Sequence, residues 1–150
     1  MNPAVATAGP QAAARVARTI TLVAGVATLV FFGLSLGPII SSLPYLYPWY
    51  DIGSAVALFG IHVVIAVVGQ FVSLPTLRRM LGAYAIVFLV AVVASVPSLN
   101  APLPARLAPW PLEVTALGTV PAAIAWRPAW VWVYLAVKSI VIAPVRWVST

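Results

Sequence analysis

The chain has 150 residues, of which 63% are hydrophobic and only 7% are charged, and its net charge is +6. A soluble domain carries roughly 25% charged residues, so this composition excludes a soluble globular protein. It predicts instead an all-α fold, a polytopic transmembrane helix bundle whose main partner is the lipid bilayer. The absence of cysteine excludes disulfides, thiolate catalysis and cysteine-held metal clusters. The basic residues are scattered singly or in pairs among apolar runs, which is typical of orientation signals for a bilayer and not of nucleic-acid binding.

Residues 1–18 are rich in small side chains, and we expect a disordered N-terminus. The following run, residues 19–38, has no charge and is long enough to cross the hydrocarbon core of ~30 Å. It exceeds the apolar core of a secretory signal, ~7–15 residues, so it is interpreted as a retained first span. The aromatic, proline-containing stretch SSLPYLYPWYD then marks a membrane interface, and Asp51 stands where a helix N-cap is expected.

The second and third predicted spans are residues 52–74 and 80–97. Between them LPTLRRM is expected to form a tight turn that carries Arg78 and Arg79. The third span is followed by NAPLPARLAPWP, whose prolines favour an extended loop over a helix.

The apolar remainder up to residue 148 is too long for one span and contains Arg127 followed by Pro128. One continuous helix would place Arg127 near the middle of the bilayer, which costs ~2.5–3.5 kcal/mol on insertion scales. A helical hairpin that turns at Arg127 avoids this cost. Four tryptophans then fall at the ends of two short helices, ~24 Å and ~26 Å apart: Trp110 and Trp126, then Trp130 and Trp147. We therefore predict spans over residues 111–126 and 129–147, five in all, with four spans as the alternative.

The arginines set the expected orientation. With the N-terminus in the cytoplasm, five spans place most arginines inside, as the positive-inside rule requires: Arg15, Arg18, Arg78, Arg79 and Arg127. The four-span alternative has a similar charge distribution but leaves the apolar stretch VTALGTVPAAIAW outside the membrane. We expect a protein of the cell membrane with a cytoplasmic N-terminus.

Four polar residues within the spans form a candidate intramembrane polar site: His62, Gln70, Glu113 and Lys138. His62 and Gln70 lie eight residues apart with Ala66 between them, so they share one helix face. A buried histidine can relay protons or bind a neighbouring helix, and we favour the second role. Lys138 starts deep in its span and needs a partner, for which Glu113 on the preceding helix is the better of the two carboxylates.

Small residues recur at four-residue spacing in the first two spans, at Gly33 and Gly37 and at Gly53 and Ala57. Such faces let helix backbones approach closely. They predict helix packing and assembly into a homo- or hetero-oligomer.

The Ala/Val-rich spans, the isolated arginines and the turn Trp126-Arg127-Pro128 resemble the N-terminal multi-pass membrane regions of actinobacterial sensor histidine kinases. This resemblance implies short helices, small loops and a signalling role, with any kinase activity beyond residue 150. The chain has no motif for a metal, phosphate loop or catalytic triad, so we expect no enzyme activity and no cofactor. The predicted function is a non-catalytic membrane module that anchors, senses or assembles. The alternative is a small transporter or channel subunit that uses His62, Gln70 and Lys138 along a polar pathway.

Overall fold

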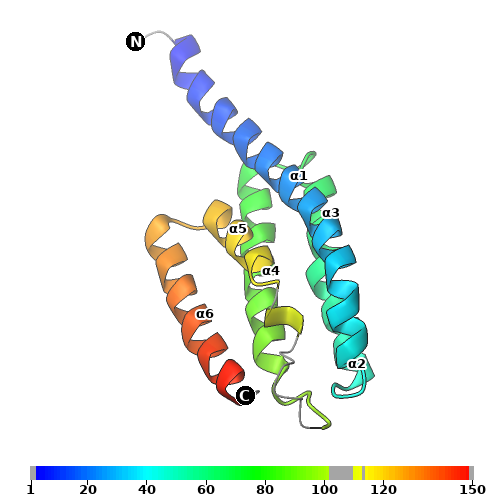
Figure 1. Cartoon of the computed structure of the whole chain (residues 1–150). Coiled ribbons are helices and arrows are strands. Elements are labelled where there is room, and N and C mark those ends of the chain that lie inside the picture. The colour runs from blue at the N-terminus through cyan, green and yellow to red at the C-terminus, as the bar shows by residue number, and fades with distance from the viewer. Residues whose placement is uncertain (1–2, 102–109, 113, 149–150) are drawn as a thin grey trace.

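The structure is a computed structural model that describes residues 3–101, 110–112 and 114–148. In these ranges it is a bundle of five helical rods without a β-strand, which confirms the predicted fold class (Figure 1). Three of the rods are long and apolar enough to cross a membrane: the part of α1 from Gly9 to Ser42, the rod Pro48–Val68 and α4.

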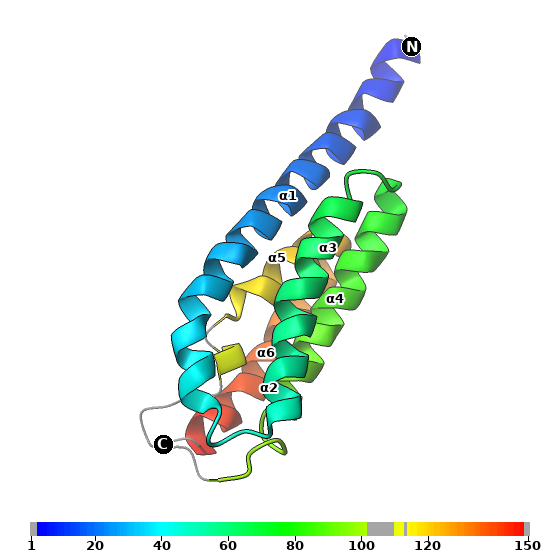
Figure 2. The same cartoon turned by 90° about the vertical axis from the view of Figure 1, so that its right-hand side faces the viewer.

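Helix α1 runs without interruption over Pro3–Ser42 and has 40 residues, so it is ~60 Å long. It differs from the expected disordered N-terminus and 20-residue span, because the alanine-rich start has high helix propensity and the helix continues through Pro38. Its N-terminal part extends beyond the other helices (Figure 2). The contact of Arg18 with Val72, in the turn before α4, marks where it leaves the bundle.

The second rod consists of α2 (Pro48–Ala55), the π-helical turn η1 (Val56–Gly60) and α3 (Ile61–Val68). It begins earlier than predicted because Pro48 is favourable in a first helical turn. The N-cap is therefore Tyr47, and the expected N-cap residue Asp51 is buried in the first turn of α2.

Helix α4 (Leu74–Ala94) also begins earlier than the sequence predicted. The side chain of Ser73 accepts a hydrogen bond from the backbone N–H of Thr76, and Pro75 occupies the first turn, both of which favour a helix start here. Arg78 and Arg79 consequently lie in the second turn of α4 and not in the connecting turn, which comprises residues 69–73.

The C-terminal part forms the predicted hairpin. Helix α5 (Ala116–Ala125) ends where Trp126 becomes extended, and α6 (Pro128–Val148) starts with a proline directly after Arg127. The predicted fourth span over residues 111–126 is shorter than expected, because Trp110–Leu112 forms a separate 3-10 turn, η2. The 10 residues of α5 extend only ~15 Å, about half of the ~30 Å hydrocarbon core.

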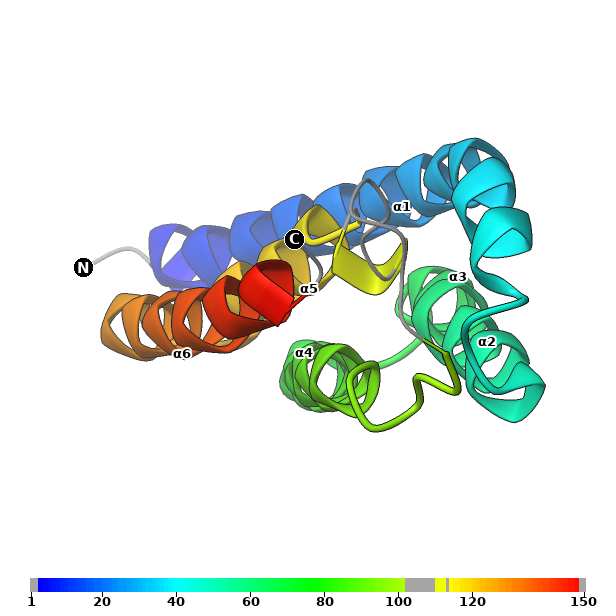
Figure 3. The ribbon, with the colours of Figure 1, turned by 60° about the horizontal axis from the view of Figure 1, so that its bottom comes forward.

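The short helix α5 lies between α1, α4 and α6, and it contacts all three (Figure 3). Its buried face presents Leu117, Gly118, Pro121 and Ala122 to these neighbours. A helix too short to cross the bilayer by itself is acceptable in this position, because one of its faces is buried against protein.

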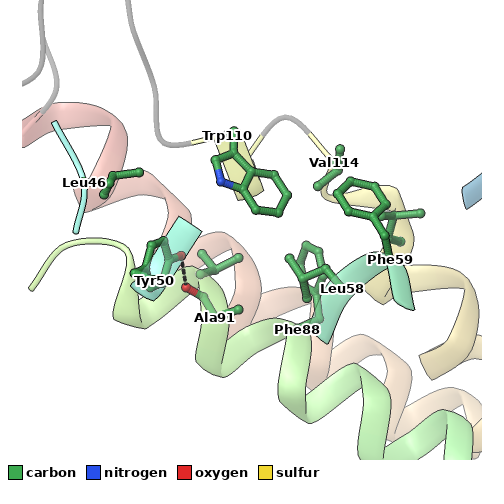
Figure 4. Packing of buried hydrophobic residues seen from close by; sticks show 10 residues of the cluster. Leu46, Tyr50, Leu58, Phe59, Phe88, Ala91, Trp110 and Val114 are labelled. Carbon is green, nitrogen blue, oxygen red and sulfur yellow. Dashed lines mark hydrogen bonds between the residues drawn. The ribbon is translucent and has the colours of Figure 1, made fainter. Parts of the chain in front are cut away.

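The largest buried cluster lies at the end of the bundle opposite the N-terminus. It joins α2, η1, α4 and η2 through side chains that include Leu58, Phe59, Phe88 and Trp110 (Figure 4). Two backbone hydrogen bonds tie the α1–α2 turn to the segment after α4: Tyr47 N–H to the Ser98 carbonyl at 3.1 Å, and Asn100 N–H to the Tyr45 carbonyl at 2.9 Å. This end of the molecule is therefore fixed by both apolar packing and backbone pairing.

Candidate functional site

The polar residues of the second rod face α1, and together they form a contact that we call the α1–α3 seam. Each helix contributes one set of residues, and the members of each set are three or four positions apart: Arg18, Thr21, Gly25 and Thr28 on α1, and His62, Ala66 and Gln70 on the rod and the turn after it. His62, Ala66 and Gln70 share one face, as the sequence predicted, and α1 is the helix that covers it.

At the end of the seam nearest the N-terminus, the amide of Gln70 connects two helices. Its Nε2 donates to the carbonyl of Ala66 at 3.0 Å and to the carbonyl of Arg18 at 3.3 Å. Nη2 of Arg18 in turn donates to the carbonyl of Val72 at 2.9 Å. Gln70 and Arg18 therefore anchor the α3–α4 turn to α1.

The middle of the seam is the closest approach of α1 and α3. A Cβ atom at Gly25 would overlap the Cβ atom of Ala66, so no larger residue fits without moving a helix. This is the type of contact that small residues permit between membrane helices.

At the other end of the seam, Nδ1 of His62 lies 2.8 Å from Oγ1 of Thr28, and both side chains are buried. Oγ1 of Thr28 also lies 2.8 Å from the carbonyl of Ala24. A hydroxyl has a single proton, so if Thr28 donates to Ala24, then His62 donates from Nδ1. Nε2 of His62 is buried and has no hydrogen-bond partner among the described residues.

The imidazole of His62 stacks on the ring of Tyr84, with centroids 4.6 Å apart and planes inclined by 29°. The hydroxyl of Tyr84 donates to the carbonyl of Leu58 at 2.6 Å, and Leu58 belongs to the π-helical turn η1. A π turn displaces carbonyls from the regular i→i+4 ladder, and such turns are frequent at functional sites. Tyr84 thus links the seam to the irregular part of the second rod.

A second polar contact lies in the buried cluster at the opposite end. Nε1 of Trp110 donates to Oδ1 of Asp51 at 3.1 Å, and the indole stacks on Phe59 with centroids 5.6 Å apart. Oδ2 of Asp51 is buried without a hydrogen-bond partner in the described part of the chain. Trp110 was predicted to lie in an interfacial belt; it is instead fully buried, because its indole packs on Phe59 and donates to Asp51.

Lys138 forms a third polar contact, between α6 and the start of α5. Its ammonium group donates to the carbonyl of Thr115 at 2.5 Å and to the hydroxyl of Thr119 at 2.6 Å. It also lies 5.7 Å from the centroid of the Phe88 ring, within the range of a cation–π interaction. The expected partner Glu113 lies outside the described residues.

The three predicted site residues that the structure describes lie in two different contacts. His62 and Gln70 belong to the α1–α3 seam, Lys138 belongs to the α5–α6 hairpin, and Glu113 is not described. The structure adds Thr28, Tyr84 and the Asp51–Trp110 pair, which the sequence reasoning missed. Among the described residues, no three histidine, cysteine or acidic side chains are close enough to hold a metal ion.

The predicted packing and interface residues have different outcomes. Gly33, Gly37 and Gly53 are exposed, and a Cβ atom at any of them would meet nothing within 4 Å, so within the chain they do not pack helices. Ala57 is half-buried. Trp126 packs on Tyr134, with centroids 5.5 Å apart, whereas Trp130 is 63% exposed. The side chain of Trp147 lies outside the described part.

No family model, curated protein or solved structure matches the chain. What the chain does must therefore be inferred from its own residues and their contacts.

Proposed function

We propose that this chain is a non-catalytic integral membrane module that anchors, senses or assembles with partners, in the manner of the membrane region of a sensor histidine kinase. The observation that carries this proposal is that the intramembrane polar groups form hydrogen bonds to the helices next to them. Gln70 and His62 each bind α1, and Lys138 binds the start of α5. Polar groups used in this way fix helix packing.

In this proposal the module resides in the cell membrane with its N-terminus in the cytoplasm. The N-terminal half of α1, the start of α4 and the α5–α6 turn lie at the same end of the bundle (Figure 1). That end, which we call the arginine end, carries Arg15, Arg18, Arg78, Arg79 and Arg127. An excess of arginine on one side favours a cytoplasmic location for that side.

The orientation can be tested directly because the chain contains no cysteine. A single Arg127→Cys variant in intact cells should resist a membrane-impermeant maleimide and react once the membrane is permeabilised. Labelling in intact cells would reverse the proposed orientation. Thr150→Cys provides the control, because α6 leads from the arginine end to the opposite end of the bundle, which this orientation places outside (Figure 1).

The proposal also includes assembly through the outward-facing small residues. Gly33 and Gly37 lie on α1 with open space around them, so a helix of a second chain can approach there. Cross-linking of a Gly37→Cys variant in membranes should give a disulfide-linked dimer, whereas Ala91→Cys, at a buried position within α4, should not. Equal yields from both variants would contradict a specific interface.

A small transporter or channel subunit is the second candidate function, and the unpartnered Nε2 of His62 is the observation that favours it. A proton-conducting histidine needs a free nitrogen. Liposomes that contain the purified chain should show no flux of protons or small solutes if the module hypothesis holds. Reproducible proton flux that His62→Ala abolishes and Thr21→Ala leaves unchanged would replace it with the transporter.

A further inference from the structure

Two adjoining grooves lie on the surface between α4 and the α5–α6 hairpin. The first, of about 340 Å³, is at the arginine end and is lined by Arg78, Arg79, Gly82 and Trp126 among others. The second, of about 390 Å³, continues between α4 and α6 and is lined by apolar and aromatic side chains. Ile86 and Trp126 line both, so the two form one continuous furrow, which we call the α4–α6 groove.

The mouth of the α4–α6 groove is positively charged. Arg78 and Arg79 are exposed there, and Arg127 follows Trp126 in the adjacent turn. The indole nitrogen of Trp126 lies directly over Gly82, where a Cβ atom would come within 2.9 Å of it. The one side-chain carboxylate in the part of the chain that the structure describes is that of Asp51, which is bonded to Trp110 at the opposite end of the bundle. The mouth therefore favours an anion, and guanidinium groups together with an indole N–H are suitable donors for phosphate oxygens.

The rest of the groove is apolar and has the length of one membrane leaflet. From Trp126 to Val137 on the hairpin, and from Arg78 to Leu89 on α4, the lining extends over eleven residue rises, or ~16 Å. This is about half of the ~30 Å hydrocarbon core. The lining side chains Ile86, Leu89 and Val133 provide apolar walls against which an acyl chain can lie.

We propose that the α4–α6 groove binds one anionic phospholipid of the surrounding leaflet. Its phosphate lies at Arg78 and Arg79 near the Trp126 indole, and one acyl chain follows the groove toward Val137. Basic pockets between membrane helices bind anionic headgroups in this manner. The combination of a charged mouth and an apolar channel of leaflet length selects a lipid over a soluble anion or an apolar helix.

The test uses the purified full chain in a non-ionic detergent with equal amounts of phosphatidylglycerol and phosphatidylcholine. Native mass spectrometry should show one retained phosphatidylglycerol per chain and little phosphatidylcholine. Each arginine near a lipid headgroup contributes roughly fivefold in affinity, so Arg79→Gln should weaken retention about fivefold and the Arg78→Gln/Arg79→Gln pair by more than tenfold. Arg15→Gln, which removes the same charge from the projecting part of α1, should leave retention unchanged.

A second pair of variants tests the apolar part. Ile86 and Val90 are exposed by 54% and 59% on α4, but only Ile86 lines the groove. Ile86→Trp should therefore abolish specific retention while Val90→Trp preserves it, with helix content by circular dichroism unchanged in both. Equal retention of the two lipids, equal loss with Arg15→Gln, or displacement of lipid by millimolar inorganic phosphate alone would overturn the proposal. So would a dimer that dissociates with Ile86→Trp without loss of lipid, because a second chain would then occupy the groove.

Discussion

The two halves of the contact between α1 and the second rod differ in how closely the helices approach. In the upper half, between Arg18 and Thr28, α1 lies directly on α3, and Gly25 meets Ala66 without room for another carbon. In the lower half, which follows Thr28 along α1, the contact is made by large rings: Phe32 lies against Phe59 with centroids 5.0 Å apart. A cavity of about 520 Å³ opens beside these rings, lined by apolar residues of both helices and by Asp51.

The difference shows that the size of the side chain at the contact, and not the number of glycines nearby, sets the helix distance. The lower half of α1 contains Gly33 and Gly37, yet both point away from the second rod. The upper half contains a single contact glycine, Gly25, flanked by Thr21 and Thr28. Polar bonds and close backbone approach therefore coincide in one half, while the other half is held by apolar surface alone.

The largest expected effect comes from filling the closest approach. Gly25→Ala places a Cβ atom onto that of Ala66, and overpacking of this kind destabilises by about 1–3 kcal/mol. Gly33→Ala adds the same atom in open space and should gain up to ~1 kcal/mol from helix propensity. Thermal unfolding in detergent measures both, and equal melting temperatures for the two variants would mean that α1 and α3 do not meet at Gly25.

The next effect concerns the polar bond of the upper half. Thr21 and Thr28 are both fully buried and both donate to the carbonyl four residues earlier, but only Thr28 also meets His62. Thr28→Val leaves Nδ1 of His62 without a partner, so it should be less stable than Thr21→Val by about 1–2 kcal/mol.

A second substitution can show why Thr28→Val loses stability. Adding His62→Phe to Thr28→Val keeps a ring against Tyr84 and removes the stranded nitrogen, so much of the lost stability should return. A double variant that is no more stable than Thr28→Val alone would assign the loss to Thr28 itself.

A smaller effect is expected where the seam joins the π turn. Tyr84→Phe keeps the ring against His62 but removes the 2.6 Å bond to the Leu58 carbonyl, and should cost about 1 kcal/mol. Tyr134→Phe loses a longer bond, 3.3 Å to the Ala85 carbonyl, and should cost less. Stability in denaturant titrations would rank them, and the reverse order would contradict the role given to Tyr84.

The smallest effect belongs to the lower half. Phe32 is 38% exposed beside the cavity, so Phe32→Leu removes contact with Phe59 but can be compensated by lipid that enters the space. We expect a loss of about 0.5 kcal/mol, since edge-on aromatic pairs contribute about 0.5–1.5 kcal/mol. A loss as large as that of Gly25→Ala would show that the two halves are equally tight.

Features that depend on residues adjacent in the sequence could be predicted. Arg127 followed by Pro128 specified a turn because both disfavour the inside of a membrane helix, and the eight-residue spacing placed His62 and Gln70 on one face. The helix that covers this face could not be predicted, because it depends on a contact between residues far apart in the chain. Thr21, Gly25 and Thr28 carry a usable signal, small residues at spacings of four and three, which the more familiar pair Gly33 and Gly37 obscured.

The buried Asp51–Trp110 bond was missed for a different reason. Each residue alone fits a common local role, a helix cap and an interfacial ring, and only the fold of the segment around η2 brings them together. The length of α5 was overestimated because the tryptophan spacing assumed a helix from Trp110 onward, whereas the helix starts at Ala116.

The π turn at Val56–Gly60 has a consequence for how this chain can change by insertion or deletion. A π turn is an α-helix that carries one surplus residue. Because the surplus residue is accommodated within the turn, loss of a single residue such as Ala57 would restore a regular helix and leave α2 and α3 in nearly the same rotation. Asp51 would then still face Trp110, and His62 would still face Thr28. The same loss in a regular part of the rod would rotate one contact against the other by about 100°, so this turn is where the rod tolerates a change of length.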